Sequence, residues 1–307
     1  MKIAVIGGAG YIGSKLVPHL VEQGHDVTVY DLLWFEENTL PVSVHKIDAL
    51  QLTEVDFEGI DAVIFLGGLS SDPMAAFAPH LNYVSNASAV AHTAYVAKQA
   101  GVKRYIYASS CSVYGFAPDK DYTEEDKPKA EYPYGVSKLQ GETALFQLAD
   151  DNFTVVSLRK GTVSGTAPMM RWDLLVNTMY TNAKKLHKIT VRNAGLWRPV
   201  LDIDDAVQAY TLALENGSGI YNIASFNTTI LDVAKKVAEW VPEADIEVLD
   251  ETEMRNYRAD WSKAERELGY KPKGSLESIL NQLIKIEPGD TSKHLDLIKK
   301  AKYTFSI

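Results

Sequence analysis

The chain has 307 residues, of which 46% are hydrophobic and 23% charged, and its net charge is −9. This balance is typical of a folded globular protein, and the length predicts one large domain with a smaller lobe. An acidic chain without a basic tract is a poor partner for nucleic acid or anionic membranes, because both bind clustered positive charge.

Signals for export, membrane insertion and metal binding are weak. The start, MKIAVIGGAGYIG, has one lysine and then a strand-like run broken by glycines, which is not a signal-peptide pattern. The longest uncharged stretch holds several asparagines and serines, so no membrane span is expected. The single cysteine, Cys111, fits a reducing cytosol, and the seven histidines show no metal-ligand spacing. We therefore expect a cytoplasmic protein that binds no metal.

Apolar runs typical of strands alternate with helical segments through the first half of the chain. The predicted strands are KIAVIGG, DVTVYD, VSVHKID, DAVIFLGG, RYIYASS and TVVSLR. Helices are expected over 11–23, near 81–100 and from Pro133 onward. Short apolar strands separated by helices predict a parallel sheet covered on both faces, as in a doubly wound Rossmann-type α/β fold.

The pattern changes after Gly161, where a loop, further helices and isolated strands follow. We therefore divide the chain into a dinucleotide-binding Rossmann domain, residues 1–160, and a smaller α/β substrate-binding lobe, residues 161–307. Parts of 200–225 are expected to return to the first domain. The functional site is expected in the cleft between the two.

Three glycines, Gly7, Gly10 and Gly13, follow the first predicted strand and open the first helix. A tight turn needs conformational freedom, and a dinucleotide diphosphate needs a backbone without Cβ beside a helix N-terminus. Tyr11 and Ile12, within the turn, belong to the same predicted site. An ordinary strand–helix turn is the alternative, but the position at the chain start favours a nucleotide site.

Asp31 ends the second predicted strand, 18 residues after Gly13, where an acid can bind a ribose 2′-hydroxyl. Because a 2′-phosphate would be repelled there and no arginine stands nearby in the sequence, the predicted cofactor is NAD rather than NADP. A solvated turn aspartate is the alternative. Asp48, at the end of the third strand, and the adjacent Ala49 are expected to border the adenine.

Tyr134 and Lys138 are four residues apart in a helix that Pro133 is expected to open, so they share one helical face. A nearby cation can lower a tyrosine pKa by ~1–3 units, which would make Tyr134 a proton acceptor near neutral pH. An ordinary surface pair is the alternative. Ser110 and Ser112 stand just past the end of a predicted strand, where ligands of open α/β sheets bind.

The glycine pattern, the segment SSCSVYG and the segment YPYGVSK together resemble the extended short-chain dehydrogenase/reductases, in the group of NAD-dependent sugar epimerases and dehydratases. The resemblance implies Tyr134 as the acid/base, Lys138 as the residue that lowers its pKa and holds the nicotinamide ribose, and Ser110 as the matching hydroxyl. Further residues are implied to lie near the cofactor: Leu66, Gly67, Gly68 and Asn86. Such enzymes commonly form homodimers, here through the helices near 81–100 and 134–149.

The expected substrate is a nucleotide-diphosphate sugar. Arg198 stands where relatives hold the diphosphate, and planar guanidinium groups suit phosphate pairs. The remaining candidate substrate contacts are Ser110, Ser112, Thr162, Arg171, Arg255 and Arg258. For each arginine, an ordinary surface position is the alternative.

Departures from the group's pattern narrow the reaction. Dehydratases of the group carry an Asp–Glu pair where Cys111 and Ser112 stand, and decarboxylating members use a glutamate at the second place. Both chemistries are therefore disfavoured. Hydride transfer at C4 of the sugar remains, by a 4-epimerase or a 4-dehydrogenase. The alternatives are a dehydrogenase of a small alcohol such as L-threonine, and a regulatory protein that binds NAD without catalysis.

Overall fold

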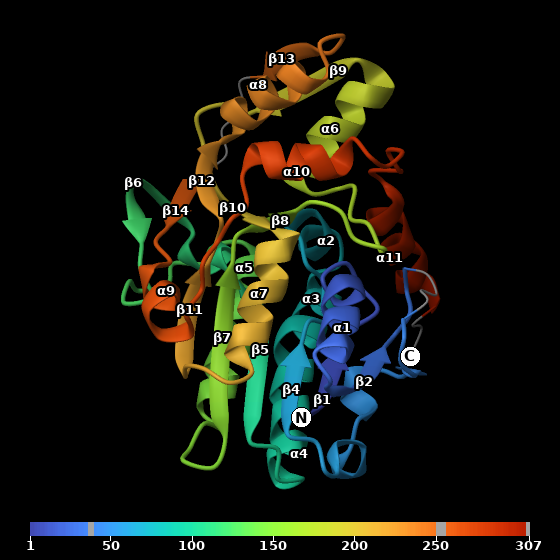
Figure 1. The fold of residues 1–307 in the computed structure, drawn as a ribbon, viewed down its shortest axis with the longest axis vertical. Coiled ribbons are helices and arrows are strands. Elements are labelled where there is room, and N and C mark those ends of the chain that lie inside the picture. The colour runs from blue at the N-terminus through green and yellow to red at the C-terminus, as the bar shows by residue number, and fades with distance from the viewer. Residues whose placement is uncertain (36–39, 250–255, 305–307) are drawn as a thin grey trace.

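The computed structural model describes residues 1–35, 40–249 and 256–304. Figure 1 shows a large sheet with helices on both faces in the lower part of the view. A smaller group of helices and short strands lies above the upper ends of its strands. Within the described ranges, no helix is long and apolar enough to cross a membrane.

The large sheet has seven parallel strands in the order β11-β7-β5-β4-β1-β2-β3. In chain order they are β1 (Lys2–Ile6), β2 (Asp26–Asp31), β3 (Val44–Lys46), β4 (Ala62–Phe65), β5 (Arg104–Ser110), β7 (Thr154–Lys160) and β11 (Gly219–Ile223). The strand order reverses between β1 and β4, and ligands of open α/β sheets bind beside the carboxyl ends at such a reversal. The predicted Rossmann-type sheet is confirmed.

Helices cover both faces of this sheet because alternate residues of each buried strand point to opposite sides. One face packs on α1 (Gly13–Glu22) and α7 (Ile203–Ala213), and the other on α4 (Ala89–Gln99) and α5 (Pro133–Phe146). In β1, for example, Ile3 and Val5 belong to the first core, whereas Ala4 and Ile6 belong to the second.

The helix expected near 81–100 is divided in the structure. It consists of α3 (Pro79–Tyr83), one π-helical turn (Val84–Ser88) and α4, and a short helix, α2 (Asp72–Phe77), precedes it. Pro79 lies in the first turn of α3, where its missing N–H costs no hydrogen bond. The sequence analysis overlooked α2.

The smaller group contains helices α6 (Leu175–Leu186), α8 (Ile230–Trp240) and α10 (Leu276–Leu283), which share one apolar core. Its strands are β8 (Thr162–Ser164), β10 (Trp197–Asp202) and β12 (Phe226–Thr229) in one sheet, and β9 (Lys188–Arg192) with β13 (Asp245–Leu249) in another. Two parts of the chain return to the large sheet, because β11 is its edge strand and α7 packs beside α1.

Four further elements flank the two groups. The strands β6 (Phe116–Tyr122) and β14 (Asn256–Ala259) pair in parallel, and α9 (Ser262–Leu268) packs on β11. The last helix, α11 (Lys293–Thr304), contacts α2 (Figure 1).

A buried ion pair joins α5 to the large sheet. Arg159 of β7 pairs with Glu142 of α5, and both side chains are almost fully buried. Ser157 donates to Glu142 at 2.7 Å, and Arg159 donates to the hydroxyl of Tyr114 at 3.0 Å. The pair therefore fixes the helix that carries Tyr134 against the sheet.

Replacing Glu142 by alanine should destabilise the protein by about 3–5 kcal/mol, because the Arg159 charge would stay buried without compensation. The free energy of unfolding in urea measures this loss. The matched control is Glu247→Ala, which removes the half-exposed partner of Lys188 and should cost less than about 1 kcal/mol. Equal losses in the two variants would contradict this role of the buried pair.

Candidate active site

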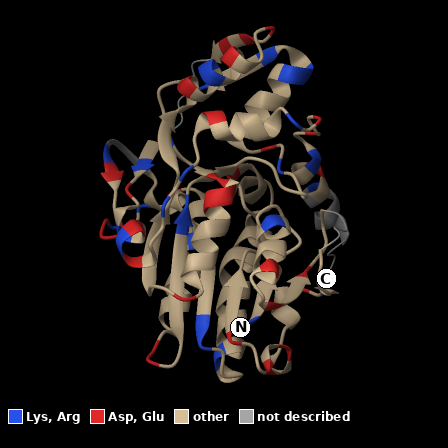
Figure 2. Ribbon diagram, viewed as in Figure 1, with Lys and Arg blue, Asp and Glu red and all other residues tan. Residues whose placement is uncertain are grey.

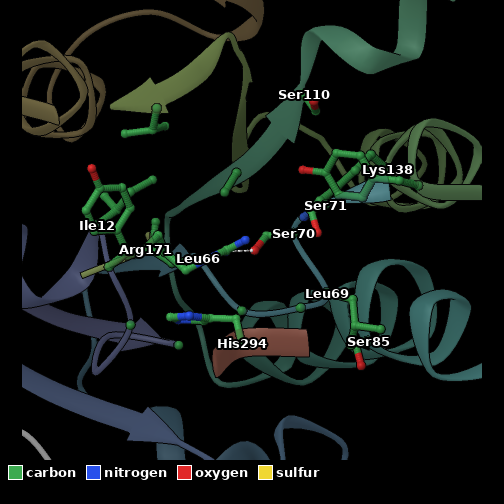
Figure 3. A pocket seen from close by; sticks show the side chains of 18 of the residues that line it. Ile12, Leu66, Leu69, Ser70, Ser71, Ser85, Ser110, Lys138, Arg171 and His294 are labelled. Carbon is green, nitrogen blue, oxygen red and sulfur yellow. Dashed lines mark hydrogen bonds between the residues drawn. The ribbon is translucent and has the colours of Figure 1, made fainter. Parts of the chain in front are cut away.

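A cleft with a volume of about 680 Å³ opens at the carboxyl ends of the large sheet. Residues of both groups line it. Most of the predicted site residues are among them: Gly7, Gly10, Tyr11, Ile12, Gly13, Asp31, Asp48, Ala49, Leu66, Gly67, Gly68, Ser110, Ser112, Tyr134, Lys138, Thr162, Arg171 and Arg198. Figure 3 shows the cleft from close by, with Lys138 and Ser110 on one side and Ile12 and Arg171 on the other.

The glycine turn forms a bare backbone cradle where β1 meets α1. Gly7 has φ +75°, and a Cβ there would lie 2.5 Å from the backbone nitrogen of Gly67. A Cβ on Gly13 would lie 2.2 Å from the carbonyl oxygen of Gly8. A Cβ on Gly10 would approach only the Gly7 carbonyl, at 3.4 Å, and would otherwise enter the cleft. This cradle at a helix N-terminus fits a dinucleotide diphosphate.

Asp31 is held at the end of β2 by the glycine turn itself. Its carboxylate accepts the backbone N–H of Ala9 at 2.9 Å and of Leu33 at 2.8 Å. Burial raises the pKa of Asp31, and these backbone hydrogen bonds oppose the rise. An acid fixed here suits a free ribose hydroxyl and disfavours a 2′-phosphate. Asp48 caps the short helix that begins at Ala49, and both residues line the cleft.

Asn86 supports the loop after β4 and is not among the residues that line the cleft. Its side-chain amide donates to the Leu69 carbonyl at 2.8 Å and to Ser137 at 3.1 Å. A Cβ on Gly68 would lie 1.9 Å from the amide oxygen of Asn86, so the loop rests directly on this side chain. Asn86 therefore supports the loop after β4, and its expected place near the cofactor stays a prediction.

Tyr134, Lys138 and Ser110 come together on one wall of the cleft, all at least nine-tenths buried. Tyr134 and Lys138 lie in α5, which Pro133 opens as expected. The Lys138 ammonium nitrogen lies 5.9 Å from the Tyr134 ring centre and 5.1 Å from that of Tyr107. Ser110 lies at the end of β5 and hydrogen-bonds the Tyr134 hydroxyl.

The predicted acidification of Tyr134 by Lys138 is wrong for this structure. Burial raises the pKa of Tyr134 well above its ordinary value, opposed by the Ser110 hydrogen bond and by the charge of Arg171. Burial, with repulsion from Lys160, also lowers the pKa of Lys138 well below its ordinary value. Removal from water disfavours the charged form of both groups. The phenol is therefore neutral near neutral pH, and burial opposes a positive charge on Lys138.

Lys160 is a second amine in this wall that the sequence analysis overlooked. It ends β7 directly opposite Ser110, lines the cleft, and donates to the Ser109 carbonyl at 2.9 Å. Burial lowers the pKa of Lys160 to about 8, with a small opposing effect from Cys111. Figure 2 shows positive charge at this end of β7. The position of Lys160 at the carboxyl end of a predicted strand is the sequence signal that could have identified this residue.

The arginines predicted to contact the substrate lie in different places. Arg198 lines the cleft, its guanidinium 5.5 Å from the ring centre of Tyr257, another residue of the lining that was overlooked. Arg258 instead pairs with Asp121 at 2.7 Å and stacks on Trp197, outside the lining.

The prediction for Arg258 is therefore corrected: its guanidinium is engaged by a carboxylate and an indole ring. Arg255 lies outside the described residues. Ser112 and Thr162 line the cleft, and the Ser112 hydroxyl is 3.2 Å from the hydroxyl of Tyr257. Arg171 lines it too, but it is bound to Asp173 and Ser70.

The pKa of Lys160 predicts how its contribution to stability changes with pH. In the folded state the pKa is about 8, against 10.5 ordinarily, so the unfolded chain binds more protons between these values. The destabilising effect of Lys160 is therefore complete below pH 8 and disappears as the pH rises toward 10.5. Lys160→Met should stabilise the protein at pH 7, and this gain should shrink at pH 9–10.

Urea unfolding of wild type and Lys160→Met at pH 7, 8, 9 and 10 measures this difference. Lys188→Met, at a half-exposed position, is the control and should show no such trend. A constant difference between wild type and Lys160→Met across this range would show that Lys160 keeps an ordinary pKa.

Comparison with known proteins agrees with this geometry. Residues 3–224 match the NAD dependent epimerase/dehydratase family. The UDP-glucose 4-epimerase of Lactobacillus helveticus is 27% identical, covering 89% of this chain and 92% of that protein. The UDP-glucose 4-epimerase of Bacillus subtilis (strain 168) is also 27% identical, with 91% and 94% covered.

Solved structures of similar fold include two complexes of one protein, MoeE5. MoeE5 in complex with UDP-glucuronic acid and NAD is 26% identical, with a TM-score of 0.83 over 93% of this chain and 98% of that chain. MoeE5 in complex with UDP-glucose and NAD is 27% identical, with a TM-score of 0.82 over the same shares.

Proposed function

Because this chain belongs to the NAD dependent epimerase/dehydratase family, we propose that it is a 4-epimerase of a nucleotide-diphosphate sugar. Its cofactor is NAD, which when bound accepts and returns the hydride of the sugar carbinol. One observation carries the proposal: Ser110, Tyr134 and Lys138 share a buried wall of the cleft that also holds the glycine turn. The two curated relatives described above are UDP-glucose 4-epimerases, which supports the same reaction.

The proton at the C4 hydroxyl is handled by Tyr134 with help from Ser110 and Lys138. A neutral phenol beside a neutral amine has the same net charge as a phenolate beside an ammonium. A positive charge on Lys138 would therefore stabilise a phenolate at Tyr134 without changing the net charge of the buried wall. The phenolate can then take the C4 hydroxyl proton, and the phenol can return it when the ketone is reduced. Ser110, which hydrogen-bonds the Tyr134 hydroxyl, would orient the same substrate oxygen.

Elimination of water is disfavoured by the residue that follows Ser110. Burial raises the pKa of the Cys111 thiol to about 12, so it stays protonated near neutral pH. The thiol lies 3.1 Å from the carbonyl oxygen of Arg159, to which it donates. A buried thiol cannot take the part of a carboxylate acid/base, and the neighbouring Ser112 has no charge. The site therefore supports chemistry at C4 without dehydration.

A uridine diphosphate sugar is the proposed substrate. The relatives named above act on UDP-glucose or were solved with UDP-sugars. Arg198 is the arginine best placed to meet the diphosphate, because it lines the cleft and its ring partner Tyr257 keeps it oriented. Guanidinium groups bind phosphate oxygens with two parallel hydrogen bonds.

Tyr134→Phe should reduce turnover by about 10²–10⁴-fold, because it removes the only atom of this side chain that can carry the proton. The variant should still copurify with NAD, as mass spectrometry of the denatured protein would show. Tyr95→Phe, at a half-exposed phenol of α4, is the control and should keep full activity. A Tyr134→Phe enzyme with near-normal turnover would rule out the proposed acid/base.

Incubation with UDP-, GDP-, dTDP- and CDP-sugars, without added NAD, tests the reaction itself. We expect interconversion of 4-epimers of a UDP-sugar, with many turnovers per enzyme. A burst of one keto sugar and one reduced cofactor per enzyme would instead identify a 4-dehydrogenase. Activity on L-threonine but on no sugar nucleotide would contradict the proposal.

We also infer that the protein is a cytoplasmic homodimer. Its two subunits would contact each other through the helices of the 81–100 and 134–149 regions. The half-exposed Tyr95 on α4 supports this surface, because a large aromatic side chain on a helix face is typical of interfaces. Light scattering would give the oligomeric state, and Tyr95→Glu should shift it toward the monomer.

A further inference from the structure

The segment 165–173, which joins β8 to α6, covers the start of α1. The Tyr11 hydroxyl donates to the Gly165 carbonyl at 2.6 Å, and the backbone N–H of Met169 donates to Ser14 at 3.1 Å. These hydrogen bonds join the segment 165–173 directly to the glycine turn and to the first turn of α1. The covering segment therefore lies over the predicted diphosphate cradle.

Arg171 extends from this segment across the cleft to the loop after β4. Its Nη1 donates to the Ser70 hydroxyl at 2.6 Å, while Nε and Nη2 donate to the two carboxylate oxygens of Asp173 at 2.7 and 2.6 Å. The loop that holds Ser70 is the one whose Gly67 abuts Gly7. Figure 3 shows Arg171 reaching from the side of Ile12 toward Ser70.

The guanidinium of Arg171 keeps donors for a ligand. A guanidinium has five N–H donors, and the three bonds to Asp173 and Ser70 use three of them. Two N–H groups thus have no acceptor among the described residues. The side chain is only 7% exposed, and it lines the cleft beside the glycine turn. Its charge acts on the hydroxyls of both Tyr11 and Tyr134.

The last helix supports Asp173 from the other side. The Nδ1 atom of His294, in α11, lies 3.8 Å from a carboxylate oxygen of Asp173. Its ring also packs on Phe35, in the loop after β2, at 4.5 Å between ring centres. Burial alone would raise the pKa of Asp173, but Arg171 and His294 hold it below its ordinary value. The carboxylate that orients Arg171 therefore stays charged.

We infer that Arg171 binds the diphosphate of the dinucleotide cofactor, not that of the substrate, and that its link to Ser70 closes the cleft over the bound cofactor. Two further N–H donors on a buried guanidinium that lines the cleft beside a helix N-terminus suit phosphate oxygens. The inference rests on the proposed function in one respect: a 4-epimerase must keep its cofactor until the ketone is reduced. A link across the cleft slows release of the cofactor and so favours epimerisation over net oxidation.

Cofactor release without any sugar present tests the inference independently of the reaction. Arg171→Met should bind NADH about 10- to 100-fold more weakly, the effect of losing a charge-assisted hydrogen bond. NADH fluorescence on dilution gives the release rate, and titration with UDP gives the affinity for the substrate diphosphate. Arg171→Met should change UDP affinity less than about twofold. Arg198→Met is the matched control, with weaker UDP binding and unchanged NADH release.

Ser70→Ala provides a second variant with little risk to folding. It keeps the guanidinium and removes only the link across the cleft, so NADH release should be faster than in wild type. Normal NADH retention in both variants would overturn the inference, as would a loss of UDP affinity in Arg171→Met with NADH retained. If NADH release rises as expected but no sugar nucleotide is epimerised, the inference stands and the proposed substrate fails.

Discussion

Exclusion of water from the wall that holds Tyr134 and Lys138 governs the chemistry of this site. Burial raises the pKa of the phenol and lowers that of the amine, so it opposes the charged form of each group. An ion pair of phenolate and ammonium has the same net charge as the neutral pair, so the charged forms of the two groups can compensate each other. A site of this kind can remove and return a proton without building up net charge in a region of low dielectric constant.

The parallel sheet brings this wall together with the cofactor cradle. Consecutive strands end at the same edge, where β1 delivers Gly7, β2 delivers Asp31, β5 delivers Ser110 and β7 delivers Lys160. The reversal of strand order between β1 and β4 opens space beside these ends. The buried Glu142–Arg159 pair then fixes α5 on the sheet, so that the helix presents Tyr134 to the same space.

Much of this arrangement could be predicted from local patterns. The strands and the glycine turn are encoded in short stretches whose burial and spacing are visible in the sequence, and Tyr134 and Lys138 share a helix. The errors concern what depends on distant segments. Asn86, in the π-helical turn, packs against the loop after β4, and Arg258 is engaged by Asp121, far away in the chain.

The charge states of the site residues were the hardest feature to predict, because they too depend on distant segments. A sequence shows which charges are neighbours along a helix, but the degree of burial depends on the whole fold. Lys138 was therefore expected to act as a cation, although its surroundings disfavour the charge. Likewise, the contact of α11 with Asp173 joins segments more than a hundred residues apart, and no local pattern indicates it.

The fate of deuterium at C4 of the sugar tests the central claim most directly. UDP-glucose deuterated at C4 would be incubated with the enzyme in ordinary water, and the 4-epimer analysed by mass spectrometry and NMR. The account predicts that the product keeps deuterium at C4, because the hydride leaves and returns within one closed site while Tyr134 exchanges only the hydroxyl proton. Loss of the label to solvent, or its appearance in free reduced cofactor, would contradict it.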